Sequence, residues 1–254
     1  MKRFIFLLTT IFICTIARAD NVSINWIVGD NTYATTQCEM GDDLILPTTP
    51  TKTGYTFRGW RIAKYIPIEY LESTGTQYIL IKDMNYRNIN VQTSIEYSSL
   101  SPWCTSINFY SKNLDTLFIN QIDTDNKWYL YFNNTVYETD YLVTTNRKYN
   151  IKINLILYDS NFITNDQIIQ SYTNYYDEVN YISLFASYKP NRGFYNACNV
   201  KFYYLKLYDN DVLVRDFIPV LDPDGVPCMY DKVEGKFYYN AGTGQFIAGP
   251  VIGE

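Results

Sequence analysis

The strongest strand signal in the sequence is the run Ile89-Asn90-Val91-Gln92-Thr93-Ser94-Ile95-Glu96-Tyr97. Most of its odd positions are apolar and most of its even positions polar, the period-two pattern of a strand with one buried face. The same alternation recurs over 149–157 and 127–132, where Trp128, Leu130 and Phe132 form the more apolar set. Further strands are predicted over 104–110, 116–122, 180–187, 199–208 and 211–220. Because no long segment repeats apolar residues at helical spacing, we expect an all-β protein.

Polar turn segments separate these strands. They are rich in Asp, Asn, Gly and Pro, residues that favour tight turns, and they cover 123–126, 133–134, 189–193, 209–211 and 222–225. Many strands joined by short polar turns are typical of an antiparallel sandwich or barrel.

The first nineteen residues have the features of a Sec signal peptide. A basic start at Met1–Arg3 precedes an apolar run over 4–16, and Ala17-Arg18-Ala19 offers small residues for cleavage before Asp20. The apolar run is too short to span a bilayer comfortably. We therefore expect cleavage between Ala19 and Asp20, and a mature chain that is secreted or held at the cell surface, with the periplasm as an alternative.

Composition narrows the function classes. The chain has no histidine, which excludes Ser-His-Asp and Cys-His hydrolases and histidine-ligated zinc. Its formal net charge of −5 becomes −8 once the three basic residues of the signal are removed, so a nucleic-acid partner is not expected. No later stretch reaches 18 uninterrupted apolar residues, so no transmembrane segment is predicted in the mature chain.

Four cysteines remain beyond the signal, at positions 38, 104, 198 and 228. An even number in an exported chain suggests disulfides, and four cysteines allow three connectivities. Cys198 and Cys228 share the C-terminal segment, and their pairing would close a loop of about 30 residues. We take this pair as the disulfide candidate, with four unpaired buried thiols as the alternative.

Two segments resemble known families, and the first is Leu46-Pro47-Thr48-Thr49-Pro50-Thr51-Lys52-Thr53-Gly54-Tyr55-Thr56-Phe57-Arg58-Gly59-Trp60. It resembles the internalin-type B repeat, also called the Listeria–Bacteroides repeat, a small β-grasp-like module of secreted and surface proteins. The resemblance implies a module over 20–64. Gly54 and Gly59 would permit turns, and Tyr55, Phe57 and Trp60 would supply most of a small core.

The second resemblance covers the rest of the chain, which we place at 65–254. It rests on the opening run Ile68–Ile79 and on the closing runs Leu213–Val220, Met229–Phe237 and Asn240–Gly244. These are similar to laminin-G-like, concanavalin A-like jelly-roll domains of bacterial surface proteins. The resemblance implies a two-sheet antiparallel sandwich whose ends pair side by side, with Gly235 in a hairpin turn and Gly242 and Gly244 in a tight turn before a strand.

Catalytic and metal sites are weakly marked. Glucanases of this fold carry a Glu-x-Asp-x-x-Glu strand, but after Glu138-Thr139-Asp140 the final position is Val143. Three Asp-x-Asp pairs could hold calcium or could be ordinary turns: Asp123/Asp125, Asp209/Asp211 and Asp222/Asp224. We expect no cofactor, and keep Asp123, Asp125, Asp222 and Asp224 as calcium candidates.

Tyrosine is abundant, with 26 copies, and many lie at polar-facing or turn positions: Tyr110, Tyr129, Tyr131, Tyr175, Tyr176, Tyr188 and Tyr195. Exposed rings beside amides can stack on sugar rings, although tyrosine is also a common strand residue. Our candidate ligand contacts are Trp103, Tyr110, Tyr188, Arg192 and Tyr195.

We therefore expect an exported, non-catalytic protein that recognises a glycan or a surface protein through its sandwich. The alternatives are a structural spacer module without a small ligand, and a glycan-active hydrolase.

Overall fold

The protein is described here by a computed structural model covering residues 2–3, 7–9, 21–28, 31–39, 43–57, 59–60, 65–112, 118–133, 135–155, 160–172 and 178–252. All regular secondary structure in these residues is β-strand, so the predicted all-β class is confirmed. This part of the chain accordingly contains no helix that could cross a membrane. The expected cleavage site between Ala19 and Asp20 lies outside the described residues.

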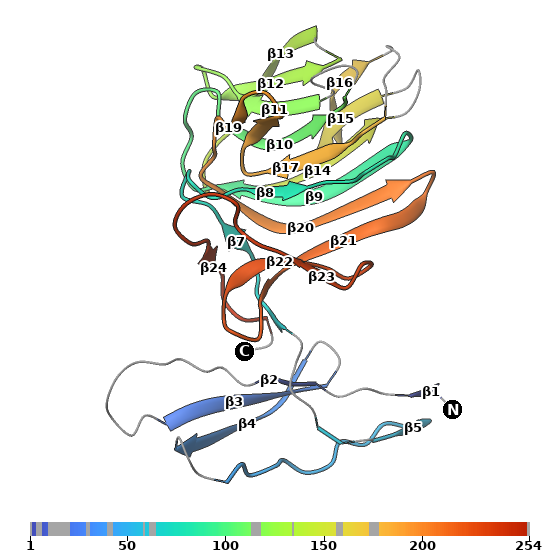
Figure 1. Ribbon diagram of the computed structural model, residues 1–254, viewed down its shortest axis with the longest axis vertical. Helices are drawn as coiled ribbons and strands as arrows, with labels where there is room; N and C mark the ends of the chain where they lie inside the picture. The colour runs from blue at the N-terminus through green and yellow to red at the C-terminus, as the bar shows by residue number, and fades with distance from the viewer. Residues whose placement is uncertain are drawn as a thin grey trace.

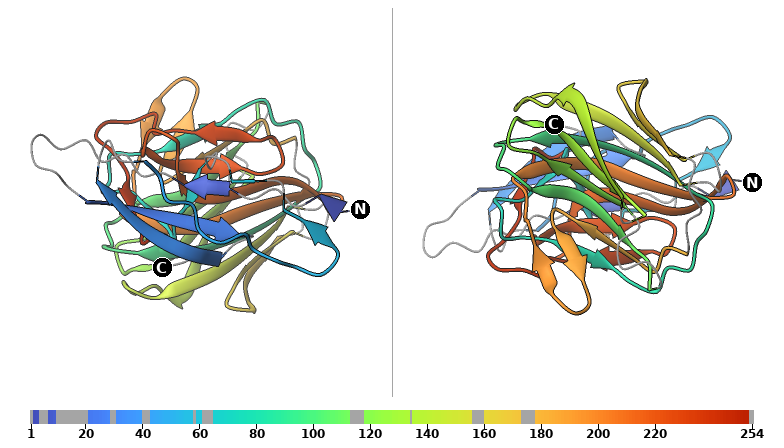
Figure 2. Two further views of the ribbon diagram at one scale, coloured as in Figure 1. Left: turned by 90° about the horizontal axis from the view of Figure 1, so that it is seen from below. Right: turned by 90° about the horizontal axis from the view of Figure 1, so that it is seen from above.

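Two antiparallel sheets form a sandwich, as predicted (Figures 1 and 2). The small sheet has the order β13 (Thr135–Leu142), β12 (Lys127–Phe132), β11 (Phe118–Ile122), β10 (Thr105–Tyr110), β17 (Tyr181–Leu184) and β8 (Ile79–Ile81). The large sheet has the order β16 (Gln167–Tyr172), β15 (Ser160–Thr164), β14 (Lys148–Leu155), β9 (Ile89–Tyr97), β20 (Val200–Asp209), β21 (Val212–Leu221), β22 (Pro227–Asp231) and β23 (Lys236–Tyr238).

The alternation seen in the sequence decides which side chains enter the core. On β14, the buried residues Tyr149, Ile151 and Ile153 alternate with more exposed polar ones, and β12 buries Trp128, Leu130 and Phe132 while leaving its tyrosines half-exposed. Successive strand residues point to opposite faces, so a single run supplies both the core and the outer surface.

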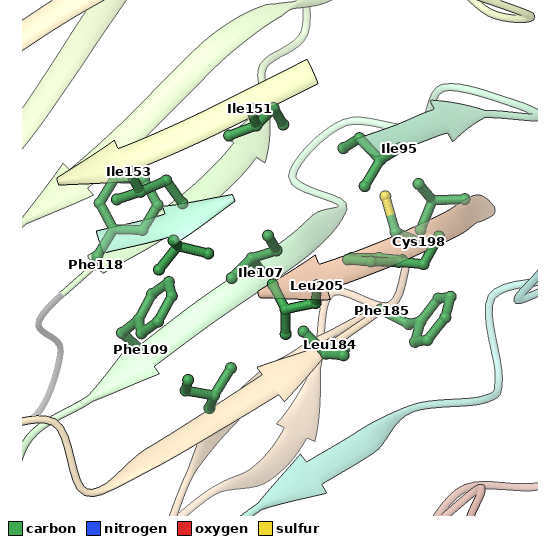
Figure 3. Packing of buried hydrophobic residues seen from close by; sticks show 14 of the residues in the cluster. Ile95, Ile107, Phe109, Phe118, Ile151, Ile153, Leu184, Phe185, Cys198 and Leu205 are labelled. Atoms are coloured by element: carbon green, nitrogen blue, oxygen red, sulfur yellow. The ribbon is translucent and has the colours of Figure 1, made fainter. Parts of the chain in front are cut away.

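Aromatic contacts join the two sheets. The ring of Trp128 on β12 lies 5.7 Å from Tyr97, 5.7 Å from Tyr149 and 5.5 Å from Phe162, measured between centroids, and these three rings belong to the large sheet. Around them the inner faces interdigitate, and Figure 3 shows Ile107, Phe109 and Phe118 of the small sheet packed near Ile151, Ile153 and Leu205 of the large one. Burial of this apolar surface is the main favourable contribution to folding.

The beginning and end of the sandwich pair with each other, as the second resemblance implies. β6 (Ile66–Pro67) pairs with β21, and β7 (Leu71–Glu72) pairs with β24 (Ile247–Ala248). The turn between β22 and β23 contains Gly235, whose φ is +70°, as expected for a hairpin turn. Gly242 lies so close to the backbone carbonyl of Thr76 that a Cβ would stand 2.1 Å from its oxygen, which explains a glycine there.

The N-terminal unit is built on a hairpin of β3 (Asn21–Val28) and β4 (Asn31–Glu39). β2 (Leu7–Thr9), which lies in the predicted signal segment, adds to the free edge of β3, and β1 (Lys2–Arg3) pairs with β5 (Tyr55–Thr56). Removal of residues 1–19 would therefore leave that edge of β3 without its present partner.

The centre of this unit differs from the prediction. Trp26 is fully buried, and Trp60 packs edge-on against it at 4.9 Å, with Phe57 5.3 Å from Trp60. Tyr55 is only half-buried, and Lys52 stands over its ring. We expected Tyr55, Phe57 and Trp60 to supply most of this core. Trp26 instead forms its centre, because it points inward from β3 and provides the surface on which Trp60 packs.

One predicted strand is interrupted. The segment 180–187 stops at Leu184, and a new strand, β18 (Ser187–Lys189), begins after Phe185, whose φ of +70° turns the chain. β18 pairs with β19 (Gly193–Tyr195) in a hairpin that stands out from the sandwich (Figure 2). Strands β13, β15 and β16 were not predicted.

The inter-sheet contact gives a first prediction. Truncation of Trp128 to Ala should lower the free energy of unfolding by about 3–5 kcal/mol, because it removes apolar contacts and leaves a cavity. Chemical denaturation followed by far-UV circular dichroism measures the change. Ile168→Ala is the control. Ile168 also lies on a β-strand but is 60% exposed, so its truncation should change the free energy of unfolding by about 0.5 kcal/mol or less. Equal losses for both variants would contradict this account of the core.

Candidate functional site

A hollow of about 300 Å³ opens on the outer face of the small sheet. Its lining combines three aromatic rings, two amides, two cations and one aliphatic side chain: Trp103, Ile119, Gln121, Tyr131, Lys189, Arg192, Tyr195 and Asn196. The first wall comes from the turn before β10 and from β12, the floor from β11, and the second wall from the β18–β19 hairpin and the residue after it. Ligand sites of this type join a few polar groups to aromatic surface in a concave place.

The first wall depends on an unusual backbone position at Trp103. Its φ is +66°, a left-handed conformation that costs energy for a bulky residue, and its N–H donates to the carbonyl of Ile122 at 2.6 Å. The indole is 41% exposed and meets the ring of Tyr129 edge-on at 5.1 Å. Tyr129 in turn lies 5.3 Å from Tyr131, so the two outward tyrosines of β12 support this wall.

The second wall is the β18–β19 hairpin. Its turn is closed by a hydrogen bond from the Arg192 N–H to the Lys189 carbonyl at 3.1 Å, and Gly193 follows with φ of +78°. The Arg192 guanidinium lies 3.9 Å over the centre of the Tyr195 ring. This cation–π contact orients both side chains at the hollow.

Buried polar groups fix the floor. Gln121 Nε2 donates to Thr105 Oγ1 at 2.9 Å, and Thr105 Oγ1 is 2.8 Å from Ser187 Oγ at the start of β18. The Thr105 N–H also donates to the Asn196 carbonyl at 2.8 Å. Because these bonds connect the sheet to the hairpin, the two walls are held in one arrangement.

The hydroxyl of Tyr129, beside the hollow, stays protonated at neutral pH. Burial, followed by the neighbouring Tyr131, raises the pKa of Tyr129 above its ordinary value. Tyr129 is therefore uncharged and can offer its hydroxyl group as donor and acceptor.

The structure brings together three of the five predicted ligand contacts, namely Trp103, Arg192 and Tyr195. Tyr110 is only 8% exposed and packs on Tyr181, with centroids 5.5 Å apart. Tyr188 is half-buried between Tyr181 and Phe194, at 5.8 and 4.8 Å. Neither residue lines the hollow. Alternation along β18 directs Tyr188 to the side of the hairpin opposite Lys189, and Tyr110 is covered by the residues packed around it.

Sequence reasoning missed the other five lining residues as candidate contacts. Tyr131 was included among the polar-facing tyrosines but not among the candidate contacts. Its alternation with the apolar Leu130 and Phe132 was the sequence signal that it faces outward. Ile119 and Gln121 lie on a strand buried along its whole length, so no exposure pattern marked them. Lys189 and Asn196 become lining residues only because the hairpin places them there.

The calcium candidates serve turns. Asp123 Oδ1 accepts the N–H groups of Asp125 and Lys127 at 2.9 and 2.7 Å, and Asp222 Oδ1 accepts those of Asp224 and Val226 at 3.0 and 2.8 Å. Asx turns of this kind account for the Asp-x-Asp spacing. Within the described ranges, no group of three or more Cys, Asp or Glu residues could hold a metal ion.

The nearest match to a catalytic strand lies apart from the hollow. Glu138 and Asp140 are exposed on β13, in a separate groove between β13 and β16, and Asp140 pairs with Lys127 at 3.1 Å. Val143, where a second glutamate would stand, is 1% exposed.

The cysteines need a correction. Cys198 lies in the main core with its sulfur 2.6 Å from that of Cys104, whereas Cys228 packs in a separate cluster with Val220 and Tyr230. The two residues of the predicted Cys198–Cys228 pair therefore do not lie together, because Cys198, just before β20, packs in the main core, and Cys228, on β22, packs in the other cluster. All four described cysteines are free thiols.

Comparison with known proteins agrees with this architecture. Residues 23–81 match the Listeria-Bacteroides repeat domain, so the first resemblance is confirmed. The match extends past residue 64 into β6, β7 and β8, which pair with strands of the sandwich. The boundary near Tyr65 stays a prediction. No curated protein matches the sequence.

Several solved structures are similar to this chain at low sequence identity. A candidate carbohydrate-binding protein from Bacteroides ovatus ATCC 8483 is similar with a TM-score of 0.54 and 9% identity, over 93% of this chain and 70% of that one. A heptameric SAP-like pentraxin from Limulus polyphemus has a TM-score of 0.48 and 10% identity, over 74% of this chain and 94% of that one. A variant of human galectin-16 has a TM-score of 0.39 and 12% identity, over 51% of this chain and 94% of that one. The chain thus joins a segment similar to the Listeria–Bacteroides repeat to a two-sheet antiparallel sandwich.

Proposed function

We propose that the chain is an exported glycan-binding protein whose ligand site is the hollow between Trp103 and the β18–β19 hairpin. The observation that carries the proposal is the convergence of three aromatic rings and two amides in one concave place. Rings stack on the C–H faces of sugars, while the amides of Gln121 and Asn196 can exchange hydrogen bonds with hydroxyl groups. The fold shared with the Bacteroides ovatus protein supports the same assignment.

Binding without hydrolysis fits the hollow best. Its described lining contains neither Asp nor Glu. Glycoside hydrolysis normally requires two carboxyl groups on either side of the scissile bond. The carboxylates of Glu138 and Asp140 border a different groove, so they do not supply this pair at the hollow.

The two cations of the hairpin favour an acidic sugar. Lys189 and Arg192 both line the hollow, and the guanidinium stacked on Tyr195 still carries N–H donors at its edge. A guanidinium pairs well with a carboxylate through two parallel hydrogen bonds. A uronic or sialic acid is therefore a better ligand class than a neutral sugar.

The aromatic wall gives a testable prediction. Wild-type chain should bind selectively on a glycan array, and Trp103→Ala or Tyr195→Ala should each weaken binding of the best ligand about tenfold, through loss of about 1.4 kcal/mol of stacking. Isothermal titration calorimetry measures the affinity. Tyr239→Ala, which removes a 46% exposed tyrosine that does not line the hollow, should bind like wild type. Absence of selective binding by the wild type, or equal losses in all three variants, would contradict the proposed site.

The cations give a separate prediction. Wild type should prefer an acidic oligosaccharide over its carboxyl-reduced counterpart by about tenfold, and Arg192→Gln should lower this ratio about threefold or more, with Lys189 keeping part of the preference. The preference should also weaken as salt is raised from low to high concentration. Lys236→Gln, which removes a cation that stands over Tyr238 instead, is the matched control. An unchanged ratio in Arg192→Gln would show that Arg192 does not recognise the carboxylate of the ligand.

A further inference from the structure

Two buried thiols meet behind the hollow. Cys104 is 2% exposed and Cys198 fully buried, and their sulfur atoms are 2.6 Å apart although 94 positions separate them in sequence. Figure 3 shows Cys198 inside the core near Ile95 and Phe185. Neither cysteine lines the proposed glycan site, so glycan binding does not explain why the two sulfur atoms lie so close together.

Their positions connect the two walls of the hollow. Cys104 directly follows Trp103, and Cys198 comes two residues after Asn196. The Cys104 N–H donates to the Ser101 carbonyl at 3.2 Å, and the Cys198 N–H donates to the Phe185 carbonyl at 2.8 Å. Both cysteines are thus held by backbone bonds in segments that shape the hollow.

The other two described cysteines are placed differently. Cys38 packs beside Ile24 and Trp26 in the N-terminal unit, and Cys228 packs beside Val220. Burial raises the pKa of the Cys228 thiol to about 12, so its reactive thiolate is scarce. The hydrogen bond from Cys198 lowers the pKa of the Cys104 thiol, whereas burial raises the pKa of Cys198 itself well above its ordinary value.

The geometry points to a disulfide between Cys104 and Cys198 that forms as the chain folds in an oxidising compartment and tethers the turn carrying Trp103 to the segment after the β18–β19 hairpin. Such compartments are where structural disulfides persist. The chain's predicted export would bring it to one.

The reaction is thiol–disulfide exchange with a small-molecule or protein disulfide as oxidant. The Cys104 thiolate attacks the oxidant, forms a mixed disulfide and releases one thiol. The Cys198 thiolate then attacks the Cys104 sulfur, forms the intramolecular bond and releases the second thiol. The two protein thiols lose two electrons and two protons, and the oxidant is reduced to two thiols. Because both sulfurs are closed off in the folded sandwich, the exchange precedes final packing.

Mapping of the cysteines tests this directly. The full-length chain is unfolded and reduced, then refolded with glutathione disulfide, and free thiols are alkylated before proteolysis without reductant. We expect one linked peptide joining Cys104 to Cys198, with Cys14, Cys38 and Cys228 alkylated. A refolded protein in which Cys104 and Cys198 are both alkylated, or in which Cys198 is linked to Cys228, would overturn the proposal.

A variant removes the ambiguity of mispairing. In Cys14→Ala/Cys38→Ala/Cys228→Ala the proposed Cys104–Cys198 pair is the one pair left in the full-length chain, and the same refolding should give the linked peptide in most molecules. The oxidised form of this variant should melt roughly 5–15 °C above its reduced form, as expected for a crosslink that closes a loop of about 100 residues. Equal melting temperatures, or thiols that stay free across glutathione ratios, would contradict the disulfide whether or not the hollow binds a glycan.

Discussion

The apolar contact between the inner faces of the two sheets is the interaction on which the rest of the structure depends. Its centre is Trp128, which extends from the small sheet into the rings of Tyr97, Tyr149 and Phe162. Once Trp128, Leu130 and Phe132 point inward, the pleat forces Tyr129 and Tyr131 outward. The same alternation that forms the core therefore creates the aromatic surface beside the hollow.

That surface becomes a site only through the irregular segments at its rim. Trp103 adopts a left-handed backbone conformation, and the break at Phe185 allows the β18–β19 hairpin to form. Backbone strain of this kind persists only where surrounding bonds impose it, and here the bonds are those from Trp103 to Ile122 and from Thr105 to Asn196. Such strain is frequent at functional sites, which agrees with the position of the hollow.

Much of the sandwich was predictable because strands such as β9, β12 and β14 alternate buried and more exposed residues. The predicted run 89–97 coincides with β9, and 127–132 with β12. The pairing of the chain's two ends came from resemblance, and the contacts of β6 with β21 and of β7 with β24 confirm it. Two of the missed strands, β13 and β16, lie at sheet edges, where exposure on both sides blurs the alternation, whereas β15 lies inside the large sheet and is short.

The site was harder to predict. Trp103, Arg192 and Tyr195 were chosen because loops carry exposed aromatic and basic residues, and these three do line the hollow. Tyr110 and Tyr188 do not line it, because both pack against Tyr181, which spacing does not reveal. The proximity of Cys104 to Cys198 was likewise invisible, since sequence gives the number of possible pairs but not which strands carry them together.

The most direct test of the central claim, that the outer face of the small sheet and its hairpin form one ligand site, is hydrogen–deuterium exchange of the full-length chain with and without an acidic oligosaccharide. The account predicts that the ligand slows exchange in peptides covering 101–105, 119–131 and 187–196, and leaves the groove of 138–141 and 167–170 unchanged. Protection confined to that groove or to the N-terminal unit, with none at the hairpin, would contradict it.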